Sequence, residues 1–402
     1  MRKTVRAIVA TILVCALTVS ASGLVAAQGT APSADATVSE SAATDAQAAS
    51  GYAGSTVSFE TRDDAVVDYA IDGETMLESV AVESQSATES RMGMGADASL
   101  DLSAVTRVGG SGLSLGTQTD LSASVSFDSG AEMTAHDGSQ GIFVVRANDE
   151  AQVASVNLSG SAQAESEGEK RVVVSQDDGA DGTFIVVGDG EVAVNEAGNV
   201  SARVGQDGTL VFRPYPDGRE DGDAEEERLI AEGTAAAEVT VSQAEDGGQY
   251  AADVVNYGQD TSVEVTQQSA SSLNMTVQRS QQQGKVVIAS LAEGIKSAED
   301  VQVYVDGEAA ARAESVTQLE SATQNGDTSR FMLSNAASAQ ASGEVLVGIN
   351  HFSTRSVSVQ ESGSNGTDSG AEGTTSASGP GFGVVIASLA VLATAFLARY
   401  RD

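Results

Sequence analysis

The chain has 402 residues, and its 57 Asp and Glu residues outnumber its 21 Lys and Arg residues, which gives a formal net charge of −36 at pH 7. Such a chain repels phosphate groups, so nucleic acid and anionic lipid head groups are excluded as expected partners. Screening of this self-repulsion requires concentrated salt, because the Debye length falls to about 3 Å only at 1 M. The composition therefore indicates a protein adapted to brine.

The amino-terminal segment has the features of a secretory signal peptide. It opens with a basic region that contains Arg2, Lys3 and Arg6. An apolar stretch over 7–19 and a run of small residues that ends at Ala27 follow. We predict a signal peptide over 1–27 with cleavage by signal peptidase after Ala27, and an uncleaved anchor is the alternative. Because Cys15 lies in this segment and is the only cysteine, the mature chain has neither disulfides nor thiolate metal sites.

Two polar segments flank the body of the chain. Residues 28–50 contain almost no large apolar side chains, so we predict a disordered spacer there. Residues 361–379 are rich in Ser, Gly and Thr and predict a flexible stalk. As a random coil, this stalk would separate the body from the membrane by about 25 Å.

The body between these segments has the pattern of β-strands. Apolar and polar residues alternate over 121–127, 301–305 and 345–349, and a period of two predicts half-buried strands. Asp-Gly pairs, which favour tight hairpins, recur at 137–138, 181–182, 189–190, 207–208, 217–218, 246–247 and 306–307. We therefore predict a mainly β fold. We expect one short helix around 315–323, where Val316, Leu319 and Ala322 share a face.

The body is too long for one ordinary sandwich, so we expect at least two β modules. A polar run at 281–284 suggests a boundary between a β-rich ectodomain over 51–284 and a compact β module over 285–360. The small side chains of 51–284 are as compatible with an extended pair of sandwiches or a solenoid as with a single core. No repeat of fixed period supports a regular solenoid.

The sequence contains no recognisable catalytic, cofactor or metal motif. The chain has two histidines, His136 and His351, and neither has metal-ligand spacing. A serine elbow, a phosphate-binding loop and a dinucleotide fingerprint are also missing. We expect His136 to be a solvated turn residue and His351 a hydrogen-bonded loop residue, with a general base at His351 as the alternative. We assign no catalytic residue, no metal ligand and no cofactor.

Two acidic clusters could supply hard oxygen ligands to Ca²⁺ or Mg²⁺. They lie at 177–181 and 217–227, but neither has the residue order of an EF-hand loop. We predict that both are solvated surface. Paired carboxylates of a hydrolase are the alternative, although a chain without tryptophan and with 4% aromatic residues is poorly suited to stack sugars.

Four sequons predict that the protein is a glycoprotein. Their asparagines are Asn157, Asn199, Asn274 and Asn365. We expect at least one to be modified, and Asn365 lies in the accessible stalk.

The carboxyl-terminal residues 380–402 combine Pro380, Gly381 and Phe382 with an uncharged run to Ala398 and a basic end. At about 1.5 Å per residue, a helix of this run just spans a bilayer, and the positive-inside rule places the body outside the cell. This tail resembles the PGF-CTERM sorting signal of archaeal surface proteins, and the lysine-poor acidic body is similar to that of haloarchaeal proteins. The resemblance implies cleavage by an archaeosortase, removal of the helix and attachment of a membrane lipid to the new carboxyl end. An ordinary retained anchor is the alternative.

These features together predict a membrane-anchored protein of the cell surface with an extracellular β body. A structural or interaction role in the envelope is the expected function, with surface-layer or other envelope proteins as partners. A surface hydrolase that uses carboxylates, with or without a divalent cation, is the alternative. A solute-binding receptor would require a two-lobed α/β pattern, which the sequence lacks.

Overall fold

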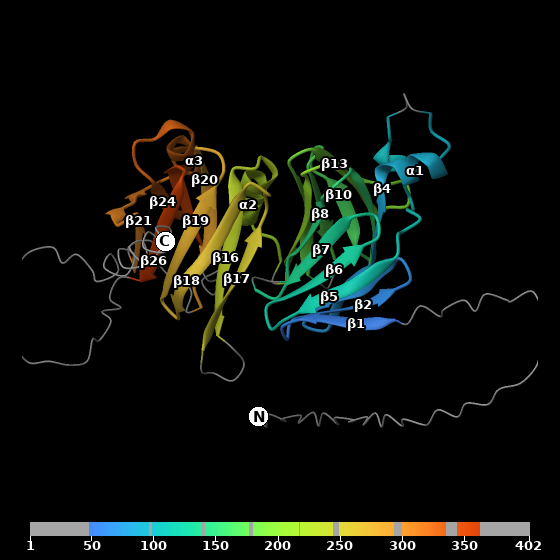
Figure 1. Ribbon diagram of the computed structural model, residues 1–402, viewed down its shortest axis with the longest axis horizontal. Helices are drawn as coiled ribbons and strands as arrows, with labels where there is room; N and C mark the ends of the chain where they lie inside the picture. The colour runs from blue at the N-terminus through green and yellow to red at the C-terminus, as the bar shows by residue number, and fades with distance from the viewer. Residues whose placement is uncertain are drawn as a thin grey trace, which may run out of the picture. The chain divides into compact units, whose positions relative to one another are not determined.

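The computed structural model (Figure 1) describes residues 48–361 except 96–98, 139–140, 177–179, 217, 244–248, 293–299 and 335–343. The predicted signal peptide, the sorting signal and most of both spacers lie outside the described residues. The body is mainly β, as predicted, and contains four sheets. Within the described ranges, none of the helices is long and apolar enough to cross a membrane.

The first sandwich consists of two antiparallel sheets, which we call sheets A and B. Sheet A has seven strands in the spatial order β1 (Ala49–Ala53), β2 (Val57–Arg62), β3 (Ala65–Ile71), β4 (Glu74–Ser84), β9 (Gln152–Leu158), β14 (Val200–Val204) and β13 (Gly190–Val194). Sheet B has eight strands in the order β10 (Gln163–Ser166), β11 (Arg171–Ser175), β12 (Asp181–Val187), β15 (Thr209–Tyr215), β8 (Phe143–Ala147), β7 (Ala131–His136), β6 (Ser122–Phe127) and β5 (Leu113–Gln118).

The inner faces of sheets A and B enclose one hydrophobic core. Its centre is a chain of aromatic rings in which Tyr69 of sheet A meets Phe143 of sheet B edge to face, at 5.2 Å between ring centroids. Phe143 and Phe184 both pack against Phe212. The buried hydroxyl of Tyr69 donates to the carbonyl of Gly141 at 2.9 Å, so this phenol is paired within the core. These aromatic rings therefore join the two sheets across the core.

The second sandwich consists of sheets C and D. Sheet C has six strands in the order β17 (Tyr250–Asn256), β16 (Ala235–Gln243), β20 (Gln283–Ser290), β25 (Val345–His351), β24 (Arg330–Leu333) and β23 (Ala311–Arg312). Sheet D has five in the order β18 (Thr261–Ser269), β19 (Ser272–Arg279), β26 (Thr354–Glu361), β21 (Val301–Val305) and β22 (Glu308–Ala309). The pairs β16·β20 and β23·β24 are parallel. Aliphatic side chains from both sheets form the core between them.

A third core lies between the outer face of sheet B and the outer face of sheet C. Ile185 and Val211 of sheet B join Ile288 and Leu346 of sheet C in one buried cluster. The central strands of these two sheets are therefore buried on both faces, and both their odd and their even positions are apolar, as in 184–187 and 286–289. The predicted alternation holds only where one face of the sheet is partly exposed, as in β6 and β21.

The structure contains more helix than the sequence predicts. The expected helix is confirmed as α3 (Val316–Asn325), whose N-cap hydroxyl on Ser315 accepts a hydrogen bond from the amide of Gln318. Sequence reasoning missed α1 (Gln85–Arg91), the short 3₁₀ helix η1 (Leu102–Ala104) and α2 (Asp221–Ala231). Of these, α2 joins the two sandwiches along the chain.

The strand pairing corrects the predicted module boundary near 281–284. Strand β20 begins at Gln283 and pairs with β16, which lies upstream of that boundary, so sheet C crosses the expected division. The actual division lies at α2, because every strand before it belongs to sheet A or B and every strand after it to sheet C or D. The β body also extends slightly into both predicted spacers, since β1 begins at Ala49 and β26 ends at Glu361.

Of two Asp-Gly pairs that were predicted to form tight turns, one does and one does not. Asp306 and Gly307 have φ angles of 54° and 80° and connect β21 to β22 as a two-residue hairpin, as predicted. The pair at 181–182 is not a turn, because Asp181 and Gly182 are the first residues of β12. There the glycine lies under the ring of Phe212, and a Cβ atom would approach that ring to 2.7 Å.

Candidate functional site: the α2 junction

The junction between the two sandwiches is built around α2. A capping box fixes the start of this helix, because the carboxylate of Asp223 accepts from the amide of Glu220 at 2.7 Å. Leu229 and Ile230 anchor it in the third core. Two carboxylates of the same helix, Glu226 and Glu227, are also almost completely buried. Buried carboxylates require compensation, and each finds it in a different set of partners.

Glu226 belongs to a cluster around Arg213 of β15, a side chain that is 2% exposed. One terminal nitrogen of this guanidinium lies 2.6 Å from Glu226 Oε2. The other lies 3.2 Å from Glu344 Oε2 and 3.4 Å from Glu238 Oε2. We call these four residues the Arg213 cluster. It contains one positive charge and three carboxyl groups. Arg213 comes from the first sandwich, Glu226 from α2, and the other two acids from the second sandwich.

The imbalance of charge in the Arg213 cluster affects the protonation of its acids. Burial, together with the adjacent charge of Glu226, raises the pKa of Glu344 well above its usual range. Burial also opposes ionisation of Glu226, but the charge of Arg213 together with hydrogen bonds to the carboxylate outweighs it and lowers the pKa of that carboxyl. Protonation of this cluster is therefore favoured at Glu344 over Glu226. A proton there reduces the repulsion among the acids.

Neighbouring hydroxyl groups complete the Arg213 cluster. The phenol of Tyr257 donates to Glu238 Oε2 at 2.5 Å, and the hydroxyl of Ser290 donates to Glu344 Oε1 at 3.2 Å. The guanidinium of Arg213 also lies over the ring of Tyr215, 5.7 Å from its centroid. These contacts fix the geometry of the charged groups.

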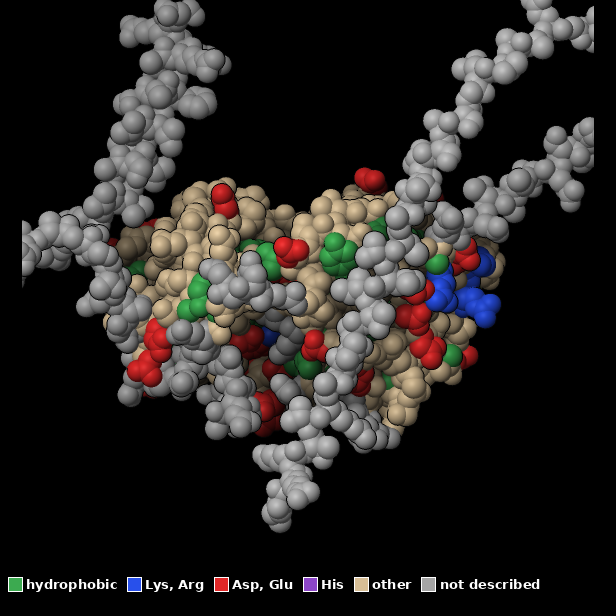
Figure 2. All heavy atoms as spheres, turned by 90° about the horizontal axis from the view of Figure 1, so that it is seen from below, with side chains coloured by type: hydrophobic (Ala, Val, Ile, Leu, Met, Phe, Trp, Pro, Cys, Tyr) green, Lys and Arg blue, Asp and Glu red, His purple; other side chains and the backbone are tan. Residues whose placement is uncertain are grey.

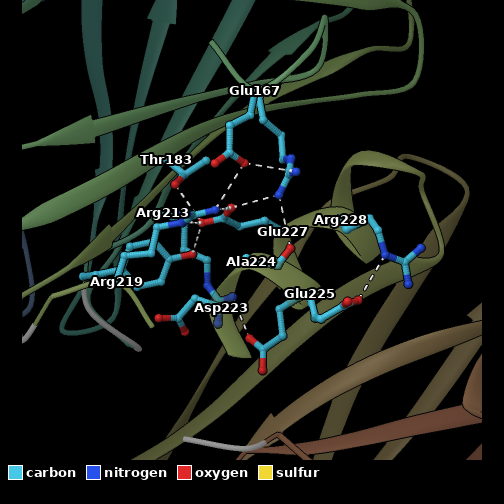
Figure 3. A network of polar contacts seen from close by, with 12 residues as sticks. Glu167, Thr183, Arg213, Arg219, Asp223, Ala224, Glu225, Glu227 and Arg228 are labelled. Atoms are coloured by element: carbon cyan, nitrogen blue, oxygen red, sulfur yellow. Dashed lines mark hydrogen bonds and ion pairs between the residues drawn. The ribbon is translucent and has the colours of Figure 1, made fainter. Parts of the chain in front are cut away.

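Glu227 belongs to a second network, shown in Figure 3, in which cations are plentiful. Its Oε1 accepts from Thr183 at 2.7 Å, from Tyr215 at 2.8 Å and from Arg219 Nε at 2.8 Å. Its Oε2 accepts from Arg219 Nη2 at 2.7 Å and from Arg171 Nη1 at 3.2 Å. We call these residues the Glu227 cluster. Burial opposes ionisation of Glu227, but the hydrogen bonds from Arg219 and Thr183 outweigh it and lower its pKa.

The two clusters connect α2 to the strands of both sandwiches. The Glu227 cluster fastens α2 to β11, β12 and β15 of sheet B, and the Arg213 cluster fastens β15 and α2 to β16 and to Glu344, which immediately precedes β25. Removing one partner from a buried set of this kind leaves an uncompensated charge. The arrangement therefore holds the two sandwiches together with directional contacts in addition to the third core.

His136 forms another tie between the sandwiches, and its predicted role as a solvated turn residue is wrong. It is the last residue of β7 and is buried, with Nδ1 2.9 Å from Oδ1 of Asp253 on β17. The other oxygen of Asp253 accepts from the amide of Gly138 at 3.0 Å. A carboxylate from sheet C thus caps the end of a strand in sheet B.

The acidic cluster at 217–227 is also different from the prediction. We expected solvated surface, but Glu226 and Glu227 are the buried members of the two clusters. In the other acidic segment, Asp181 accepts from the amide of Arg219 at 3.2 Å, and 177–179 lie outside the described residues. Among the described residues, no group of three His, Cys, Asp or Glu side chains has the geometry to hold a metal ion.

His351 is exposed and is the last residue of β25. The prediction that it lies in the loop after this strand is therefore wrong. Its carbonyl accepts from Arg355 Nε at 2.8 Å. The residue lines a hollow of about 240 Å³ together with Asp306 and Arg355, which form an ion pair with each other.

The three predicted glycosylation sites that the structure describes all have side-chain amides that donate hydrogen bonds. Asn157 lies on β9, an interior strand of sheet A, and its Nδ2 donates to Ser79 at 2.9 Å. Asn199 donates to Asn157 Oδ1 at 3.2 Å. Asn274 lies on β19 and donates to Gln267 at 3.3 Å on an exposed face. Asn365, like Ala27 and the tripeptide Pro380-Gly381-Phe382, lies outside the described residues.

The exterior contrasts with the junction. On the face drawn in Figure 2, acidic side chains are scattered over the surface, whereas basic side chains gather mainly at one edge. The excess negative charge of the chain is therefore displayed toward solvent, and several of its arginines are used inside the junction.

A cleft lies beside the clusters. It has a volume of about 610 Å³, and residues of both sandwiches line it, among them Gly188, Asp207, Gln259 and Lys285. We call it the junction cleft. A hollow of about 420 Å³ adjoins it and shares Gln259, Asp260 and Ser280 with it.

The junction contains residues that sequence reasoning missed, above all Arg213. The available signal was its position inside the apolar run 209–215, where an unpaired arginine would be costly. No protein-family model matches the chain, and no curated protein matches its sequence.

Proposed function

We propose that this protein is an acidic, surface-anchored component of a haloarchaeal envelope, with a structural or interaction role for its two-sandwich body. The observation that carries this proposal is the α2 junction, where buried ion pairs from both sandwiches are used for cohesion. A body that is exposed to the medium at the end of a tether benefits from such cohesion. The acidic exterior would keep it soluble in concentrated salt.

The anchoring part of the proposal rests on the two ends of the sequence. Signal peptidase would release the chain after Ala27, and an archaeosortase would act near Pro380-Gly381-Phe382 and leave a lipid at the new carboxyl end. Surface-layer or other envelope proteins would be the partners, and the partly exposed Asn274 and the stalk residue Asn365 would be the first glycosylation sites to examine.

Mass spectrometry of the protein purified from its native membrane tests this proposal. We expect no peptide from 1–27 or from 384–402, and a lipid-modified end upstream of Val384. Digestion of intact cells with an added protease should release peptides of the body. Recovery of intact tail peptides from most of the membrane-bound protein would contradict the sorting step, and protection of the body in intact cells would contradict surface display.

The alternative function, a hydrolase that uses carboxylates, would have its site in the junction cleft. Asp207 and Glu232 both line this cleft, although Glu232 also pairs with Arg228 at 2.7 Å. Esterase, protease, phosphatase and glycosidase substrates should therefore be tested in high salt, with and without Ca²⁺. Turnover that disappears in Asp207→Asn, with the melting temperature unchanged, would favour the hydrolase over the structural role.

A further inference from the structure

The junction cleft has the size and position of a small-molecule site. Its volume of about 610 Å³ lies within the range of about 300–1,000 Å³ that is usual for such sites, and it is formed where two sandwiches meet. One wall comes from sheet B and its loops, through Gly188 and Asp207. The other comes from the segment after α2 and from the β17–β18 and β19–β20 connections, which contribute Gly233, Gln259 and Ser280, and from Lys285 on β20.

Lys285 lines this cleft and forms no ion pair among the described residues, although the charge of Asp260 acts on it. No carboxylate lies within 4.0 Å of its ammonium among the described residues, and the adjacent Asp260 pairs with Arg279 at 2.7 Å. Lys285 Nζ donates to the carbonyl of Gly233, which uses one of its three donors. Burial, followed by the charge of Arg279, lowers the pKa of Lys285. An incoming anion would relieve this unfavourable environment.

The remaining side chains of the cleft indicate what such an anion would look like. Gln259, Ser280 and Gln281 offer amide and hydroxyl groups, and Asp207 offers a carboxylate that can accept from hydroxyls. The other two carboxylates of the lining, Glu232 and Asp260, pair with Arg228 and Arg279. The one aromatic residue in the lining, Tyr257, is fully buried and donates its hydroxyl to Glu238. The cleft therefore suits a ligand with several hydroxyl groups better than a flat aromatic acid.

We propose that the junction cleft binds a small hydroxylated carboxylate of the sugar-acid class, with Lys285 as the partner of its carboxylate. The hydroxyls of the ligand would pair with Gln259, Gln281 and Asp207. Such a site would give the junction a second role besides cohesion. Binding of a soluble acid there would affect how the two sandwiches pack against each other.

Isothermal titration of the full-length protein in high salt tests this site, with galacturonate as the probe and galactose as the uncharged control. We expect saturable binding of galacturonate at concentrations up to about 10 mM and at least about tenfold weaker binding of galactose, because one charge-assisted contact is lost. Lys285→Met should weaken galacturonate binding by about tenfold or more. Arg312→Met removes an exposed cation outside the cleft and should leave binding unchanged.

Lys285 also contacts the end of α2, so a second variant separates binding from folding. Gln281→Glu adds a negative charge at an exposed position of the cleft and should weaken galacturonate binding severalfold without affecting the melting temperature. The proposal is overturned if galacturonate does not bind the wild-type protein, or if Lys285→Met and Gln281→Glu bind it as well as the wild type does.

Discussion

Glu226 and Glu227 are neighbours on α2, yet their surroundings differ in charge. Acids outnumber cations around Glu226, and cations outnumber acids around Glu227. Glu226 shares the single guanidinium of Arg213 with Glu238 and Glu344. Glu227 has Arg171 and Arg219 within 3.2 Å, together with hydroxyls on its other lone pairs. The difference shows that burial alone does not determine how an acidic residue affects stability. Both carboxyls have lowered pKa values, but the single cation of the Arg213 cluster leaves its third acid, Glu344, with a raised pKa, so a rising pH weakens one cluster at Glu344 and a falling pH weakens the other at Glu227.

Glu344 and Glu227 should therefore contribute to the pH dependence of stability in opposite directions. The pKa of Glu344 is raised in the folded protein, so its contribution to stability is complete below the unfolded value, about 4.3, and is lost as pH rises through the folded value. The pKa of Glu227 is lowered, so its contribution is present above about 4.3 and is lost as pH falls through the folded value. Substitutions at the two clusters can separate these contributions.

The largest effect is expected from Arg213→Met. This change leaves the buried carboxylates of Glu226 and Glu238 without their cation, and breaking a buried ion pair in this way costs about 3–5 kcal/mol. Denaturant unfolding in high salt should report this loss in the free energy of unfolding. The control is Arg203→Met, which removes an arginine whose pairs with Asp189 and Glu191 lie at the surface and should cost at most about 1 kcal/mol. Equal losses in both variants would contradict the importance of the Arg213 cluster.

A smaller loss is expected from Glu227→Gln. The amide keeps one acceptor for Thr183 and Tyr215 but removes the charge that faces Arg171 and Arg219, so we expect a loss of about 2 kcal/mol at pH 7. The loss should shrink when unfolding is measured at acidic pH, because the wild-type carboxylate is then protonated too. Glu225→Gln on the same helix changes an exposed carboxylate and serves as the control. A loss that is independent of pH would argue against ionised Glu227.

Glu344→Gln should have the opposite sign. Glutamine has one carbonyl oxygen to accept from Ser290 or Arg213 in place of the two carboxyl oxygens, but it cannot ionise, so it removes the repulsion that an ionised Glu344 adds. We expect a gain of about 1 kcal/mol at pH 8 and a flatter dependence of the melting temperature on pH. Glu308→Gln, at an exposed position of β22, should leave the pH dependence as it is in the wild type. Destabilisation of Glu344→Gln at pH 8 would mean that Glu344 is ionised in the folded protein.

The effect of salt on stability should differ between the acidic surface and the buried junction. Lowering the salt concentration from the molar range to 0.1 M lengthens the Debye length from about 3 Å to about 10 Å, so repulsion among the exposed acids returns and the wild-type melting temperature should fall. The penalty of Arg213→Met should change much less over the same range, because its partners are buried. A wild-type melting temperature that is insensitive to salt would show that the acidic excess is tolerated and not required.

Much of the fold could be predicted from the sequence, and the parts that could not have clear physical causes. Alternation identified β6 and β21, and apolar spacing identified α3. Alternation also located β25, but residues 345–349 of that strand are buried on both faces rather than on the one face that was predicted. The pattern could not reveal the third core, because strands buried on both faces lose their alternation. The boundary at 284 failed for a related reason, since the parallel pairing of β20 with β16 joins segments that are separated in sequence.

The junction was harder to predict than the sheets. Glu226 and Glu227 lie in an acidic run that resembles solvated surface, and their partners Arg213 and Arg171 come from distant strands. Local sequence carries no record of such long-range pairing. The apolar context of Arg213 was the one local clue, because an arginine within a buried strand requires compensation.

Hydrogen exchange during denaturant unfolding, followed by mass spectrometry, tests most directly whether the α2 junction makes the two sandwiches one cooperative unit. We expect peptides from β12 and β15 to lose protection at the same denaturant concentration as peptides from β16 and β20 in the wild type. In Arg213→Met, the two sets should separate, because each sandwich keeps its own core while the junction is weakened. Separate midpoints in the wild type, or a shared midpoint in the variant, would contradict this account.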